Sequence, residues 1–269
     1  MSLFSKKIKA VSDIIAEAVK NVKQDDISFS NYINEIEKEA HRLYLLEERK
    51  AIKEILLMKV NPENKLKDIL EKIADIVIEL STVISNTRRS RGGISSEYIL
   101  SYALKKYGID NEPVGRKKSK RSYYPDVAIP SMEVLEKNPD KAIALAVKRT
   151  LRERWREDLS IFSHFHNAAF VCISDSTDIT EGKLLDMQKE GLKVLFLPDQ
   201  LYLSLKNFIE ENIKQMEVYE LSHLPQWIKR KLITQNHPLT DRTDRWLLIL
   251  FALMESRKQL LKGNIHDTY

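Results

Sequence analysis

A carboxylate and a lysine are spaced in the sequence as two neighbouring strands would place them. Asp126 lies in the middle of an expected strand at residues 123–129. Lys148 lies 22 residues later, at the end of the next expected strand, residues 142–150. Carboxylate oxygens can hold Mg²⁺, and a lysine can orient a water molecule or offset charge on a phosphate. If a short connection brings the two side chains together, they suit metal-assisted hydrolysis of a phosphodiester; an ordinary salt bridge is the alternative.

Three charged residues that follow Lys148 could read bases in the major groove. Arg152, Glu153 and Arg154 begin an expected helix at residues 152–162. Arginine makes a bidentate contact with guanine, and glutamate accepts a hydrogen bond from the amino group of cytosine. A helix with ordinary i,i+4 ion pairs is the alternative, but the residues at that spacing carry like charges and would repel each other. The element therefore predicts recognition of C/G base pairs.

Positive charge is concentrated in the middle of the chain. The whole sequence carries a formal net charge of +5, but residues 86–156 hold 17 Lys and Arg against 8 Asp and Glu, and the rest holds 27 against 31. A basic segment of this kind is typical of a nucleic-acid contact surface, although a solvated basic face is the alternative. Basic residues outside the base-reading element would contact phosphates, which position a protein without specifying sequence. The candidates are Arg88, Arg89, Arg91, Lys117, Lys118 and Lys120.

Composition argues against several other classes of protein. The single cysteine, Cys172, excludes an internal disulfide and indicates a reducing cytoplasm. The longest apolar run, residues 246–254, is too short to span a bilayer, and the first residues lack the apolar run of a signal peptide. His164 and His166 could suggest zinc, but the other histidines are scattered and too few ligands result. We therefore expect a cytoplasmic protein without a structural zinc site.

The elements that must position these residues form an α/β pattern. Helical spacing of apolar residues predicts helices over residues 3–85, followed by a break at 86–93 and a helix at 95–107 that ends before Gly108. Beyond residue 122 the period changes to that of strands and helices in a mixed core. We expect a helical N-terminal region, residues 1–85, that serves as a dimerisation or DNA-embracing arm, and a catalytic and DNA-recognition domain, residues 86–269. The further strands are expected at 168–173 and 193–197, and the further helices at 181–190 and 241–262.

Several segments of the sequence resemble one enzyme family. YPDVAIPS at residues 124–131 and AVKRTLRERWRE at 146–157 resemble the PD-(D/E)XK type II restriction endonucleases. The likeness is to the branch around EcoRII and NgoMIV, which cuts CCGG or CCWGG sites, with BsaWI the nearest candidate. TRRSRGGISSE at residues 87–97 and the segment 184–205 are also similar to this branch. The resemblance implies a restriction-endonuclease-like mixed β-sheet flanked by helices.

The resemblance also implies the roles of individual residues. Lys148 would be the catalytic lysine, and Asp126 would hold Mg²⁺. The usual second acid, two residues before the lysine, is replaced here by Ala146, which cannot bind metal. The CCGG branch supplies that acid from a helix instead, and Glu97 is the residue that matches. A further family glutamate falls on Ile161, so the match fails there, and Glu157 or Asp158 could substitute.

The function implied is Mg²⁺-dependent cleavage of double-stranded DNA at a short C/G-rich palindrome, leaving 5′-phosphate and 3′-hydroxyl ends. A CCGG core with A/T flanks, WCCGGW, is the first expectation and CCWGG the second. Cutting both strands requires two active sites, and therefore a homodimer or a higher assembly of dimers. The alternative is a non-catalytic, sequence-specific DNA-binding regulator. It would share the basic segment but would not explain the placement of Asp126, Lys148 and Glu97.

Overall fold

The computed structural model describes residues 3–23, 27–61, 63–114, 124–149, 155–156, 159–174 and 179–236. The chain divides into two compact units, Met1–Ile228 and Lys229–Tyr269. The sheet and every candidate site residue described below belong to the first unit. Only residues 229–236 of the second unit are described, and the helix expected at 241–262 lies outside them.

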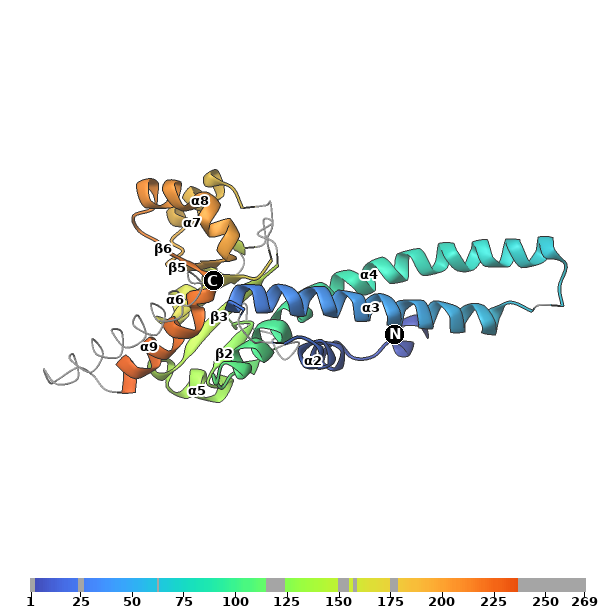
Figure 1. Cartoon of the computed structure of the whole chain (residues 1–269), viewed down its shortest axis with the longest axis horizontal. Coiled ribbons are helices and arrows are strands. Elements are labelled where there is room, and N and C mark those ends of the chain that lie inside the picture. Colours follow the sequence, from blue (N-terminus) through green and yellow to red (C-terminus); the bar gives the residue numbers. More distant parts are fainter. Residues whose placement is uncertain are drawn as a thin grey trace, which may run out of the picture. The chain divides into compact units, whose positions relative to one another are not determined.

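The first unit is built around a six-stranded mixed sheet whose strands lie side by side in chain order (Figure 1). The first three strands pair antiparallel, and the last four pair parallel. This confirms the expected α/β class with a mixed sheet flanked by helices. The two outermost strands were not expected, because both are short and one contains a proline. The strands are β1 (Glu112–Pro113), β2 (Val127–Ile129), β3 (Ile143–Lys148), β4 (Ala168–Cys172), β5 (Val194–Leu197) and β6 (Glu217–Glu220).

Helices cover the sheet because the strands are apolar on both faces. The central strands β3, β4 and β5 are buried almost throughout, as expected for parallel strands with both faces covered. Helices α6, α7 and α8 contribute Ile161, Leu184 and Ile209 to one apolar cluster with the sheet. The helices of the described residues are α1 (Leu3–Lys7), α2 (Val11–Asn21), α3 (Phe29–Lys59), α4 (Leu66–Lys106), α5 (Met132–Lys137), α6 (Leu159–His164), α7 (Glu181–Lys189), α8 (Asp199–Asn212) and α9 (Leu224–Asn236), with 3₁₀ turns η2 (Pro139–Lys141) and η4 (Leu221–His223). None of the helices in these described ranges is long and apolar enough to cross a membrane.

Helices α3 and α4 pack side by side as an antiparallel pair, and the end of α4 nearest the sheet contacts β3 and β1 (Figure 1). The expected break at residues 86–93 is wrong, since α4 runs through it without interruption. Contacts with α3 on this stretch, described below, outweigh the low helix propensity of Gly92 and Gly93. The expected boundary between residues 85 and 86 therefore falls inside one helix, and the division into two domains there stays a prediction.

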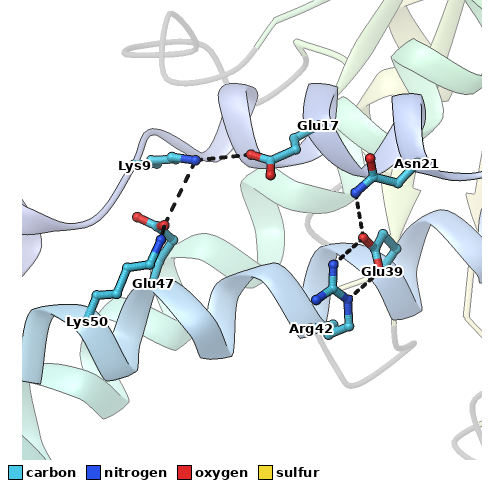
Figure 2. Close-up of polar contacts among 7 residues, drawn as sticks. All are labelled: Lys9, Glu17, Asn21, Glu39, Arg42, Glu47 and Lys50. Carbon is cyan, nitrogen blue, oxygen red and sulfur yellow. Dashed lines mark hydrogen bonds and ion pairs between the residues drawn. The ribbon is translucent and has the colours of Figure 1, made fainter.

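Helix α2 packs on α3 and is fixed to it by polar contacts (Figure 2). Glu39 of α3 accepts hydrogen bonds from Arg42 and from Asn21 of α2, each at 2.7 Å. These hydrogen bonds, those from Arg42 above all, lower the pKa of Glu39 to about 2. Lys9, just before α2, pairs with Glu47 of α3 at 3.9 Å. The buried residues of α2 are Ile14, Ile15 and Ala18.

The glycine pair inside α4 leads to a prediction about stability. A Cβ added at Gly92 or Gly93 would meet no atom within 4 Å, so neither glycine is required by packing in the first unit. Replacing either by Ala should raise the free energy of unfolding by about 1 kcal/mol, because glycine is a poor helix former. Gly108 is the control: its φ of +72° ends the helix, so Gly108→Ala should lower stability by about 1 kcal/mol. Urea unfolding of the three variants checks this, and a loss of stability at Gly92 and Gly93 would contradict it.

Candidate active site

Asp126 and Lys148 lie together where strand β2 begins and its antiparallel neighbour β3 ends. Lys148 is the last residue of β3, and Asp126 immediately precedes β2, one position before the strand rather than in its middle. The Asp126 carboxylate accepts a hydrogen bond from the backbone N–H of Val147 at 2.6 Å. The Lys148 Nζ atom lies 3.7 Å from Asp126 Oδ2. The structure therefore brings together the carboxylate and the lysine that the sequence indicated.

Backbone pairing explains why these two side chains share one face of the sheet. The register of β2 and β3 pairs Ala128 with Ala144, and the Asp126 backbone N–H continues the ladder to Leu145 O at 2.8 Å. Side chains alternate between faces along a strand, so Asp126 falls on the same face as Ala128, and Lys148 on that of Ala144. The Asp126 side chain is 5% exposed and that of Lys148 is 26% exposed. The Asp126 carboxylate is thus buried, whereas the Lys148 amine is partly accessible to solvent.

The usual second acid is absent from β3, as the sequence showed. Ala146 is fully buried in the apolar cluster on the sheet. Glu97, the expected replacement, lies in α4 and is only 9% exposed. A glutamate is seldom this buried without a functional or electrostatic reason. Its role as the second metal ligand stays a prediction.

The donor chemistry of these residues fits Mg²⁺ better than it fits zinc. Across the part of the chain that the structure describes, no three His, Cys, Asp or Glu side chains gather into a metal-binding group. Mg²⁺ does not require such a cage, since it is commonly held by one or two carboxylates together with water and phosphate oxygens. Asp126 and Glu97 would supply the two carboxylates. His164 and His166 are both exposed, and His164 Nδ1 contacts Ser160 O at 2.8 Å.

The basic residues of α4 lie in two different environments. Arg88 makes hydrogen bonds of 2.6–3.2 Å to Glu48 of α3, whose side chain is only 5% exposed. The guanidinium of Arg91 stacks over the ring of Tyr44 at 5.2 Å, and burial lowers its pKa. Arg89 is exposed. Arg88 and Arg91 therefore join α4 to α3, a role that the sequence did not indicate.

Several predicted site residues lie outside the described residues. These are the base-reading candidates Arg152, Glu153 and Arg154, the basic residues Lys117, Lys118 and Lys120, and the alternative acids Glu157 and Asp158. Ile161, the position of the missing family glutamate, is fully buried in the core of the first unit. Cys172 is also buried, in β4.

The sequence matches the EcoRII C-terminal family over residues 44–219. The chain belongs to the EcoRII C-terminal family. The match begins in α3 and ends in β6, so it includes Glu97, Asp126, Lys148 and the residues between them. The chain is therefore a homologue of restriction endonucleases. No curated protein matches the sequence.

Solved structures show the same fold. The complex of the restriction endonuclease PspGI with substrate DNA is similar at a TM-score of 0.67 and 22% identity, covering 86% of this chain and 96% of that one. Metal-depleted Ecl18kI with uncleaved DNA is similar at a TM-score of 0.64 and 20% identity, covering 95% and 91%. Metal-depleted Ecl18kI with uncleaved, modified DNA gives 0.65 and 15%, covering 91% and 86%. At these identities the likeness shows the restriction-endonuclease fold.

Proposed function

We propose that this member of the EcoRII C-terminal family is a type II restriction endonuclease. It would cut both strands of DNA at a short C/G-rich palindrome in a Mg²⁺-dependent reaction. The single observation that carries the proposal is the contact between Asp126 and Lys148, where β2 begins and β3 ends, inside the family match. The similar PspGI and Ecl18kI structures are DNA complexes, which supports DNA as the partner.

Each residue of the site has a distinct chemical task. Asp126 and Glu97 would hold Mg²⁺, which when bound offsets phosphate charge and lowers the pKa of a bound water. Lys148, with its amine partly exposed beside Asp126, can orient the attacking water or stabilise charge on the scissile phosphate. The N–H of Val147 fixes the Asp126 carboxylate. That carboxylate is therefore positioned by the backbone of the same strand that carries the lysine.

Recognition and assembly extend the proposal. Arg152, Glu153 and Arg154 would read guanine and cytosine edges, and a CCGG core with A/T flanks is the first expectation, with CCWGG the second. One active site per chain requires a homodimer, or a higher assembly of dimers, to cut both strands of a palindrome. The helical region at residues 1–85 would serve as a dimerisation or DNA-embracing arm. We place the enzyme in the cytoplasm, where its DNA substrate would be found.

The exposed basic residues are proposed to contact phosphates. A comparison of Arg89, which is exposed, with Arg88, which pairs with Glu48 of α3, should separate a role in DNA contact from a structural role. Arg89→Ala should leave stability unchanged, weaken binding equally on cognate and scrambled duplexes, and reduce the salt slope of binding by about 1. Arg88→Ala should cost about 2 kcal/mol of folding free energy, because it removes a charged hydrogen bond from the buried Glu48. Urea unfolding and gel-shift titrations at several salt concentrations measure both effects. A destabilised Arg89→Ala with normal DNA binding would contradict the assignment.

A single plasmid digest distinguishes the proposed endonuclease from the competing function, a non-catalytic DNA-binding regulator. Plasmid DNA is incubated with the purified protein with and without Mg²⁺. Discrete fragments that appear only with Mg²⁺ support the enzyme, whereas a retarded but intact band supports the regulator. The contact between Asp126 and Lys148 favours the first outcome, because cleavage requires a carboxylate beside a lysine and DNA binding alone does not.

A further inference from the structure

Helix α3 contacts the turn of α4 that carries Glu97. The hydroxyl of Tyr44 shares a hydrogen bond of 3.0 Å with Ser95 Oγ. Ser95 is 5% exposed and precedes Glu97 by two residues. The Tyr44 ring is held in turn by the guanidinium of Arg91, 5.2 Å from its centroid. This stretch of α4 is thus fixed to α3 by one specific polar contact and one stacking contact.

The same helix contacts the residue that follows Lys148. Arg149 forms an ion pair with Glu37 of α3. The Glu37 side chain is only 14% exposed, so the pair is partly sheltered from water on one side. Arg149 directly follows the last residue of β3, and the ion pair therefore fixes the end of the strand from which Lys148 projects.

Glu37 and Tyr44 lie on the same side of α3. They are seven residues apart, and residues at that spacing share a face of a helix. Burial raises the pKa of Tyr44, whereas the Ser95 hydrogen bond and the charges of Arg91 and Arg149 pull it down. Arg149 is thus ion-paired with Glu37, and its charge also acts on Tyr44. One face of α3 therefore connects the Glu97 turn of α4 to the Lys148 end of β3.

We propose that Tyr44 and Glu37 are positioning residues, which fix the positions of Glu97 and Lys148 relative to each other. This rests on the roles proposed above for Glu97 and Lys148. Neither positioning residue is placed on the reacting atoms; each acts through a neighbour, Ser95 or Arg149. The physical reason is that a small misplacement of a catalytic group is costly, on the order of 10²-fold in rate for about 1 Å. A helix that contacts both sides of the site limits such displacement.

The Tyr44 arm is tested by metal dependence measured without cleavage. Ca²⁺ is titrated into protein with cognate DNA, and gel-shift binding gives the half-saturating Ca²⁺ concentration. Tyr44→Phe and Ser95→Ala should each raise that concentration about 2- to 10-fold, the effect of one hydrogen bond. The double variant should be no worse than either single one, because both remove the same contact. Tyr219→Phe, which loses a 2.8 Å hydrogen bond to Glu217 on β6, is the matched control and should behave as wild type.

The Glu37 arm is tested by the rate of a single turnover. Glu37→Gln keeps the shape of the side chain and removes the charge that pairs with Arg149. Cleavage at saturating Mg²⁺ should fall about 10-fold, while affinity for cognate DNA in Ca²⁺ stays unchanged. Urea unfolding of every variant separates misplacement from loss of folded protein. A change in DNA affinity with a normal rate would overturn this arm.

Failure of the inference can be told apart from failure of the proposed function. If Glu97→Gln leaves both the Ca²⁺ dependence and cleavage unchanged, the metal role proposed for Glu97 is wrong. If Glu97→Gln removes cleavage but Tyr44→Phe and Ser95→Ala match Tyr219→Phe, only the positioning role is overturned. Additive effects in the Tyr44 and Ser95 double variant would also overturn it, since the two residues would then act separately.

Discussion

Asp126→Asn and Lys148→Ala should each reduce DNA cleavage by about 10³-fold or more, the loss expected when several kcal/mol of charge stabilisation are removed. Asn keeps the size of Asp126 and can still accept the N–H of Val147, so the fold should be retained. Lys148→Ala should spare most specific binding, because this residue acts on the scissile phosphate and not on a base. Single-turnover cleavage of a cognate duplex, together with gel shifts in Ca²⁺, measures both properties.

The matched control for the carboxylate is Asp140→Asn, in the exposed turn η2, which should cut at the wild-type rate. Glu97→Ala should also abolish cleavage. If Glu97→Ala cuts at nearly the wild-type rate, the second acid lies elsewhere, and Glu157 and Asp158 become the next candidates. Near-normal cleavage by Asp126→Asn would show that the proposed active site is wrong.

The second large effect should fall on sequence recognition. Replacing Arg152 or Arg154 by Ala should weaken binding to the cognate site by about 5- to 150-fold at fixed salt, since one bidentate base contact contributes about 1–3 kcal/mol. Non-specific affinity should change little, because it comes from phosphate contacts. Gel-shift titrations on cognate and scrambled duplexes in Ca²⁺ measure the two affinities separately.

Glu153 provides the sharper test of base reading. A carboxylate repels the phosphate backbone, so it is favourable in the groove only where a cytosine amino group donates to it. Glu153→Ala should therefore damage specificity at least as much as the arginine variants. If Arg152→Ala and Arg154→Ala lower affinity equally on both duplexes, these arginines contact phosphates. The expectation of a C/G-rich site would then have to be given up.

The parts of the fold with local signals were predictable from the sequence. Strands β3, β4 and β5 were expected because each is a short apolar run bounded by turn residues. The position of Lys148 at the end of β3 followed from the same pattern. Strand β1 has only two residues, and β6 (EVYE) is partly exposed and contains two glutamates, so neither is an apolar run that would give such a signal. Local pattern thus identified the strands at the centre of the sheet and missed its edges.

Features that depend on contacts between distant segments were not predictable. The expected break in α4 came from the residues around Gly92 and Gly93, whereas the contacts of Arg88 and Arg91 with α3 support a continuous helix. Tyr44 and Ser95 are separated by 51 residues, and no spacing rule relates them. Glu97 could be singled out only by resemblance to a family, since one glutamate on a helix carries no signal by itself.

The most direct test of the account is to sequence the ends that the protein leaves on a long DNA of random sequence in Mg²⁺. Our account predicts double-strand breaks at one short C/G-rich palindrome, with 5′-phosphate and 3′-hydroxyl termini, and no breaks with Lys148→Ala. Breaks at unrelated sequences, or intact DNA under conditions where the protein binds it, would contradict the proposal that this chain is a site-specific endonuclease.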